Sequence, residues 1–219
     1  MLYLYALSEP PTILPSMAGL DESVLAVEHL GAIDAIVSVV DSARIEPTDE
    51  AVLGHAGVVD ALAAANAAVL PARFGRGFGD ATALRSAVAE RSTELQQALA
   101  RVRGCAELAV RVLAPTNGGR GAIESGGEYM RARLDDQRRT DRLAEELHAP
   151  LASLARAATK SVGASPELLL SGTYLVPRDA LDRFEARVAE LGADHPELTL
   201  ACTGPWPPYS FATAEPGGS

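Results

Sequence analysis

The run IDAIVSVV, residues 33–40, constrains the fold more than any other part of the chain. Apolar residues occupy both alternating sets of positions, so a strand formed here would be buried on both faces and belongs in the middle of a sheet. A second apolar run, VLAVEHL at 24–30, precedes it, and Gly31 stands between the two. This spacing predicts an antiparallel hairpin with a tight turn.

Length and composition indicate a globular protein made of one large domain or two small ones. The chain has 219 residues, of which 47% are hydrophobic and 22% are charged, as is typical of folded proteins. Its formal net charge of −10 opposes binding to phosphate backbones, so we expect no nucleic-acid partner. The first residues do not resemble a signal peptide, and apolar runs stay shorter than the roughly 18 residues of a membrane span. We therefore expect a cytoplasmic protein with no membrane partner.

The segments around the hairpin predict further strands and a helix. LYLYAL at 2–7 is typical of a strand. Thr48, followed by two acidic residues, predicts the start of a helix that runs to Ala68. AVLPARF at 68–74 predicts a strand at a sheet edge or bulge, because Pro71 has no backbone donor for an inner ladder.

Two more elements complete a first domain, which we predict over residues 1–114. Asp80 predicts the N-cap of a helix over 81–101, and CAELAVRVLA at 105–114 predicts a buried strand. The resulting order, βββαβαβ, favours an α+β sandwich with helices packed on one face of a sheet.

The segment PTNGGRGAIESGG, residues 115–127, is rich in glycine and predicts a linker or loop. We predict a second domain over 128–219. It begins with a charged helical stretch, 128–159, in which Pro150 predicts a kink or two consecutive helices. A strand at 168–177, a helix that Asp179 caps and that runs to Leu191, and a last strand at 197–204 follow, which gives the order αβαβ and a tail.

The most enzyme-like segment is RFGRGFGD, residues 73–80, in which three glycines stand between a predicted strand and a predicted helix. Their spacing matches neither the dinucleotide nor the Walker pattern. Asp80 at the N-cap would also repel a phosphate and occupy its donors. A structural turn is therefore favoured, although a small-molecule-binding or enzymatic α+β domain that uses the turn at 75–79 stays as the alternative, testable by ligand-induced thermal stabilisation.

The residues that usually carry catalysis or bind metals are scattered. The four histidines have no short spacing to one another or to a cysteine, and no G-x-S-x-G motif occurs. Cys105 and Cys202 each fall in a predicted strand and read as small buried side chains. We expect no catalytic residues, no metal and no cofactor, and hence no enzyme.

The segment CTGPWPPYSF, residues 202–211, places aromatic residues in a proline-rich stretch directly after the last strand. Polyproline II geometry would put Trp206 and Tyr209 on one side, because they are three residues apart. These rings could fix the tail to its own domain or present an aromatic surface to another protein. The two roles are compatible if one ring points inward and the other outward.

Six segments that extend over nearly the whole chain form a recognisable series. They are YLYAL near the start, VLPARFGRGF at 69–78, GCAELAVRV at 104–112, GGEYMRARL at 126–134, SGTYLVP at 171–177 and CTGPWPPYSF at 202–211. Together, and in this order, they resemble the gas vesicle protein GvpL/GvpF family. The resemblance implies two domains, an N-terminal α+β domain and a C-terminal domain of modified ferredoxin-like form. It leaves the L and F branches undistinguished.

The resemblance also implies a non-enzymatic role in gas vesicles, as an accessory or minor structural protein. Such a protein would bind the shell protein and other accessory proteins during nucleation and assembly. The residues that we predict at the partner interface are Arg73, Phe74 and Arg76 in the first domain and Trp206 and Tyr209 in the tail.

Overall fold

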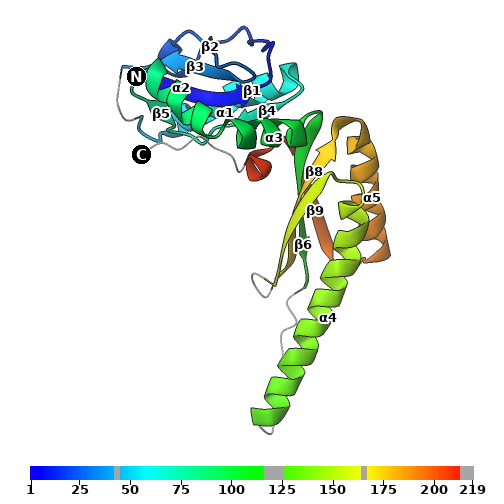
Figure 1. Cartoon of the computed structure of the whole chain (residues 1–219). Helices are drawn as coiled ribbons and strands as arrows, with labels where there is room; N and C mark the ends of the chain where they lie inside the picture. Colours follow the sequence, from blue (N-terminus) through cyan, green and yellow to red (C-terminus); the bar gives the residue numbers. More distant parts are fainter. Residues whose placement is uncertain (42–44, 116–125, 164–166, 213–219) are drawn as a thin grey trace. The chain divides into compact units, whose positions relative to one another are not determined.

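Two parts of the chain each form a sheet of their own in the computed structural model, which describes residues 1–41, 45–115, 126–163 and 167–212 (Figure 1). One compact unit consists of Met1–Ala106 together with the chain from Trp206 onward, and the other of Glu107–Pro205. The chain therefore leaves the first unit after Ala106 and returns to it at Trp206. The predicted limits, 1–114 and 128–219, stay a prediction, and the predicted linker lies largely in residues 116–125, outside the described residues.

The sheet of the first unit has the strand order β2-β3-β1-β4, with β5 also paired to β1. Its strands are β1 (Leu2–Ser8), β2 (Ala26–His29), β3 (Asp34–Val39), β4 (Val69–Pro71) and β5 (Gly77–Phe78). The hairpin is confirmed, because β2 pairs antiparallel with β3. The inner place of β3, between β2 and β1, is also confirmed. Pro71 lies in β4 at the end of this order, as its missing donor requires.

The helices of the first unit are α1 (Asp49–Ala65), α2 (Ala81–Glu90) and α3 (Ser92–Val102). Both predicted N-caps are confirmed: the side chain of Thr48 accepts from the amide of Ala51, and that of Asp80 from the amide of Ala83. The helix predicted over 81–101 is divided at Arg91, where the backbone leaves helical geometry (φ −119°, ψ 17°). Burial along both halves follows the predicted helical spacing, with Leu84, Val88, Leu95, Leu99 and Val102 buried.

Helix α1 ends at Ala65, three residues before the predicted end, because the Asn66 side chain pairs with the backbone of Ile13. The Asn66 amide group accepts from the backbone amide of Ile13 (2.8 Å) and donates to the Ile13 carbonyl (2.9 Å). A side chain that pairs with a distant backbone offers the chain an alternative to continuing the helix. The core between α1 and the sheet contains Tyr3, Tyr5, Ile36, Val58, Val59 and Leu62, among other buried residues.

The second unit has the element order β-α-β-β-α-β, which is that of ferredoxin-like folds. Its elements are β6 (Cys105–Leu113), α4 (Gly126–Ala152), β7 (Ala157–Val162), β8 (Leu168–Pro177), α5 (Leu181–Asp194) and β9 (Thr199–Trp206). The strand order is β7-β8-β6-β9. Its core is formed from inward side chains of α4, β6, β8 and α5, such as Leu147, Val110, Tyr174 and Phe184.

The strand predicted at 105–114 is present as β6, and it pairs in the second sheet. Its buried pattern marks an inner strand without indicating which sheet it joins. Two expectations about the other elements are wrong. The helical stretch 128–159 ends at Ala152, two residues after Pro150, and its last part belongs to β7, an edge strand. Asp179 does not cap α5, whose N-cap is Ala180 without a side-chain hydrogen bond.

Candidate partner-binding surface

The loop that carries Arg73, Phe74 and Arg76 connects β4 to β5, and β1 holds both of its ends. The backbone amide of Ala72 donates to the carbonyl of Tyr5 (2.9 Å), and the amide of Leu4 donates to the carbonyl of Arg76 (2.8 Å). Gly75 forms the turn between them with φ +84°, a conformation that glycine adopts without strain. The loop is therefore anchored directly to an inner strand of the sheet.

A buried tyrosine and histidine also fix this loop from beneath. The backbone amide of Gly75 donates to the hydroxyl oxygen of Tyr3 (3.1 Å), and that hydroxyl contacts Nδ1 of His55 (2.8 Å). Nε2 of His55 lies 3.0 Å from the carbonyl oxygen of Ala72, which can only accept. His55 is therefore protonated on Nε2, and Tyr3 donates to its Nδ1. Every polar atom in this chain of contacts has a partner.

Burial determines the protonation of this pair. Desolvation lowers the pKa of His55, against an opposing contribution from the hydrogen bond to Ala72, and the ring stays neutral. Desolvation likewise raises the pKa of Tyr3, although the hydrogen bond from Gly75 acts in the other direction. The network is therefore uncharged and positions the loop without placing a charge in the core. Sequence reasoning did not identify Tyr3 or His55, because nothing in their separation of 52 residues signals a contact.

The three predicted loop residues differ in how they are placed. Arg73 is exposed, whereas Phe74 is half-buried and packs edge to face on Tyr3 and on His55, with ring centres 6.3 and 5.8 Å apart. The guanidinium carbon of Arg76 lies 5.9 Å from the centre of the Phe78 ring. The loop thus presents positive charge at its surface while Phe74 secures it to the core.

The tail after β9 is fixed to the first unit by residues other than the two predicted rings. Trp206 is 51% exposed and Tyr209 is 41% exposed. Pro207, Pro208 and Phe211 are buried instead, and Tyr209–Phe211 form a 3-10 turn. The predicted polyproline II segment is wrong, because β9 extends through Pro205 to Trp206. Since β9 is the edge strand of its sheet, a proline is tolerated there.

Tyr3 connects the loop with the tail. Tyr209 lies close enough to contribute to the raised pKa of Tyr3, whose hydroxyl also accepts from Gly75 in the loop. The structure therefore brings Tyr209 near the base of the loop that carries Phe74. We name the loop, residues 73–76, and the tail residues Trp206 and Tyr209 together the candidate surface, and its binding of a partner stays a prediction.

The glycine turn has a structural role. Gly77 pairs with Tyr3, and Phe78 pairs with Leu2, as β5 adds to β1. At the start of α2, the carboxylate of Asp80 already accepts from the amide of Ala83 (2.8 Å). Both the strand pairing and the cap use backbone groups that a phosphate loop would leave for its ligand. This geometry supports the structural turn and gives no support to nucleotide binding.

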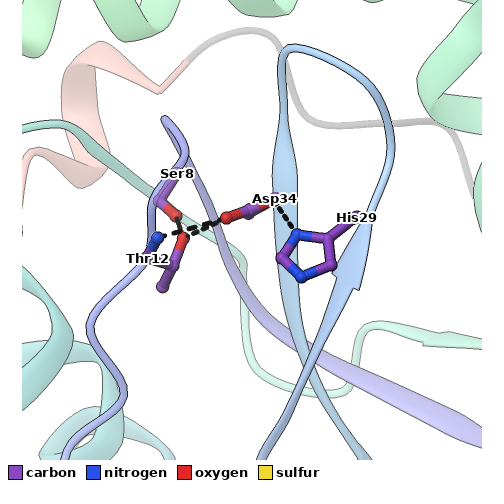
Figure 2. Close-up of polar contacts among 4 residues, drawn as sticks. All are labelled: Ser8, Thr12, His29 and Asp34. Atoms are coloured by element: carbon purple, nitrogen blue, oxygen red, sulfur yellow. Dashed lines mark hydrogen bonds and ion pairs between the residues drawn. The ribbon is translucent and has the colours of Figure 1, made fainter.

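A second polar cluster, which the sequence did not indicate, lies at the start of β3 (Figure 2). The carboxylate of Asp34 accepts from the amide and hydroxyl of Thr12 (3.2 and 2.8 Å) and contacts Nδ1 of His29 (2.7 Å). The hydroxyl of Ser8 contacts that of Thr12 in turn. The carboxylate stands between the hydroxyls and the imidazole, whereas a nucleophilic triad needs the imidazole in the middle. This cluster therefore holds the loop after β1 against β3.

The described residues contain neither a cluster of metal ligands nor a helix suited to a membrane. Within the described ranges, no three His, Cys, Asp or Glu side chains gather as metal ligands would. Among the helices in those same ranges, none combines the length and apolar character that crossing a membrane requires.

Comparisons with known proteins identify relatives along the whole chain. Residues 1–213 match the family model described as gas vesicle synthesis protein GvpL/GvpF. Gas vesicle protein F2 of Halobacterium salinarum is 31% identical over 182 residues, covering 82% of this chain and 76% of the relative. Gas vesicle protein F1 of the same organism is 28% identical over 96% of this chain and 92% of its own length.

Solved structures show the same fold. The crystal structure of gas vesicle protein GvpF from Anabaena sp. PCC7120 superposes with a TM-score of 0.81 at 17% identity, covering 98% of this chain and 96% of that one. GvpF from Microcystis aeruginosa gives a TM-score of 0.78 at 17% identity, with coverage of 97% and 98%. Since the family model spans nearly every residue and curated relatives agree with it, the chain belongs to the GvpL/GvpF family of gas vesicle synthesis proteins.

Proposed function

We propose that this protein is a non-enzymatic gas vesicle accessory or minor structural protein that binds the shell protein and other accessory proteins during vesicle nucleation and assembly. It would act in the cytoplasm and at the gas vesicle. The observation that supports this proposal most is family membership over residues 1–213. The two compact units would act as its domains, the first an α+β sandwich and the second of modified ferredoxin-like form.

The contact would be made by the loop and tail surface of the first unit. Its side chains combine arginine charge at Arg73 and Arg76 with exposed aromatic area at Trp206 and Tyr209. Arginine, tryptophan and tyrosine are the residues most enriched among those that dominate binding energy at protein interfaces. The backbone beneath them is held in place by Tyr3, His55 and the buried end of the tail, so little ordering entropy would be lost on binding.

The mechanism that we favour resembles that of a chaperone. A shell subunit rich in apolar surface aggregates unless that surface is covered before assembly. A soluble protein with a net charge of −10 would keep such a complex dispersed through its own repulsion. The purified protein should then suppress aggregation of the shell protein at a stoichiometric ratio.

The test is capture of the co-expressed shell protein on the tagged full-length chain. We expect capture by wild type and a reduction of at least about tenfold in Trp206→Ala/Tyr209→Ala and in Arg73→Ala/Arg76→Ala. Arg85→Ala and Val24→Ala remove an exposed charge and an exposed apolar side chain elsewhere on the same unit, and should capture normally.

Each variant is compared with wild type in thermal unfolding, so that loss of binding is separated from loss of folding. If wild type fails to capture the shell protein, the proposed partners of this surface would be other accessory proteins instead. Equal loss in the Arg85 and Val24 controls would rule out the loop and tail surface as the binding site.

A further inference from the structure

Helix α4 projects past the ends of the strands in its own sheet (Figure 1). It has 27 residues, yet its first fully buried side chain among those described is Ala144. Every described side chain from Met130 to Arg139 is exposed. Isolated helices shorter than roughly 12–15 residues are marginal in water, so a segment like this one is normally stabilised by packing against something.

The projecting segment, residues 130–142, carries apolar and basic side chains along adjoining lines. Met130 and Leu134 are 56% and 53% exposed and lie one turn apart. Arg131, Arg138 and Arg142 recur at spacings of seven and four residues, which places them on one side of the helix beside the apolar pair. The segment contains five arginines against three aspartates, so it is positive on a chain that is strongly negative.

Part of this positive charge is not neutralised locally. Asp135 pairs with Arg138 (3.4 Å) and Asp136 with Arg139 (3.7 Å). In the portion of the chain that the structure describes, Arg131 and Arg142 have no ion-pair partner. Desolvating these arginines requires an acidic surface opposite them, and the apolar pair requires an apolar contact.

The first unit carries a surface with the matching properties, on helix α1. Asp49, Leu53 and Asp60 follow one another at helical spacing and are exposed, Leu53 to 70%. Met17, itself exposed, lies beside the same helix near Gly57. Helix α1 contains one further acidic residue, Glu50, and neither lysine nor arginine occurs between residues 49 and 65.

We propose that the projecting segment of α4 on one copy of this protein docks onto the acidic face of α1 on a second copy. Leu53 and Met17 would meet Met130 and Leu134, while Asp49 and Asp60 would face the arginine line. Because the two surfaces are different, this contact is heterologous. A pair of copies keeps one unused surface of each kind, so further copies add head to tail. The inference goes beyond the proposed function, because it assigns a self-association that needs no shell protein.

The test is sedimentation velocity of the full chain over a range of concentrations at low and high salt. Wild type should associate reversibly, and association should weaken with added salt because exposed charges are screened. Arg131→Glu/Arg142→Glu and Asp49→Lys/Asp60→Lys should each weaken association at least about tenfold. Arg111→Glu/Arg183→Glu changes the net charge by the same amount as the first variant at two exposed positions of the second unit, and should associate as wild type does.

Mixing the two interface variants gives the sharpest result. One retains an intact α1 face and the other an intact α4 segment, so each alone should be monomeric. A chain that carries all four substitutions should regain association, because the signs of the charges are then exchanged on both surfaces. An equimolar mixture of the two double variants contains both the native pair of surfaces and the charge-reversed pair, so it should associate as wild type does although each variant alone does not.

Three results would overturn the inference. Wild type that stays monomeric at low salt would show that the α4 segment does not bind a second copy. Association that survives Arg131→Glu/Arg142→Glu would place the contact elsewhere. A mixture that remains monomeric, with both variants folded by circular dichroism, would show that the two surfaces do not meet.

Discussion

Each compact unit buries a strand tyrosine against a helix histidine, but the two pairs have different surroundings. In the first unit the hydroxyl of Tyr3 on β1 lies 2.8 Å from Nδ1 of His55 on α1. In the second, the hydroxyl of Tyr174 on β8 lies 2.9 Å from Nδ1 of His148 on α4. Both tyrosines are fully buried, and burial raises the pKa of each.

The difference lies in what else each pair holds. His55 is buried and also donates to Ala72, while Tyr3 accepts from Gly75, so this pair fixes the loop of the candidate surface. His148 is only half-buried, next to the ion pair of Glu145 and Lys160, and its pair joins α4 to the sheet. The same two residue types therefore position a surface loop in one unit and attach a helix in the other.

The largest effect is expected from removing each histidine. His55→Ala leaves the hydroxyl of Tyr3 and the carbonyl of Ala72 without their partner and opens a cavity, which should lower the free energy of unfolding by about 3–5 kcal/mol. His148→Ala removes a half-buried ring whose partner can rehydrate, and should cost about 1–2 kcal/mol. Hydrogen exchange read by mass spectrometry resolves the two units, and equal losses in both would contradict the comparison.

Removing only the hydroxyl groups should give a smaller difference in the same direction. Tyr3→Phe leaves Nδ1 of His55 and the amide of Gly75 unpaired and should cost about 2–3 kcal/mol, with faster exchange at Gly75. Tyr174→Phe breaks one hydrogen bond and should cost about 1 kcal/mol. If Tyr3→Phe left the loop amides as protected as before, the backbone contacts of Ala72 and Arg76 would be sufficient to hold the loop.

A change within the loop itself should cost less again. Gly75 has φ +84°, so Gly75→Ala should destabilise the first unit by about 1–2 kcal/mol through backbone strain. Gly79→Ala is the matched control, because a methyl group at Gly79 would meet open space and its backbone lies outside the left-handed region. Urea unfolding followed by the fluorescence of Trp206, the one tryptophan of the chain, measures both variants. Equal midpoints would mean that the loop relaxes around Gly75.

Local chemistry in the sequence predicted much of the first unit. Thr48 and Asp80 cap their helices as expected, since an N-cap depends on residues within one turn. The inner position of β3 followed from its apolar faces, and Pro71 correctly indicated an edge. These features depend on neighbouring residues or on whether a strand is buried, and both can be inferred directly from the local sequence.

The predictions that differ from the structure concern features that depend on residues distant in the sequence. The apolar alternation of β6 suits either sheet, and pairing with β8 and β9 rather than β1 is decided by the fold as a whole. The stretch 152–159 is rich in alanine, which favours a helix, but residues from Ala157 onward pair antiparallel with β8 as an edge strand. For the candidate surface, Arg73 and Trp206 stay predictions, whereas the sequence did not indicate that Tyr3, His55 and the buried Phe211 lie beneath the loop and the tail.

The smallest effect should come from acid, and it again separates the two pairs. Burial lowers the pKa of His55 and of His148, the latter with a further lowering by Lys160 and an opposing effect of Glu145. A histidine in the unfolded chain takes up its proton near pH 6.5. Between that pH and the lowered pKa of the fold, the unfolded state binds more protons, so both contributions are complete above about pH 6.5 and decline as the pH falls.

Because His55 is buried more deeply than His148, its share of this decline should be the larger. Unfolding free energies measured in urea at pH 7.5 and pH 5.5 for wild type, His55→Gln and His148→Gln isolate each share, since the carboxylates are common to all three. His55→Gln should flatten the pH dependence of the first unit, and His148→Gln should flatten that of the second to a lesser degree. An unchanged slope in His55→Gln would mean that the Tyr3 and His55 pair opens to solvent before the histidine is protonated, and the loop would then be held by its backbone contacts to β1.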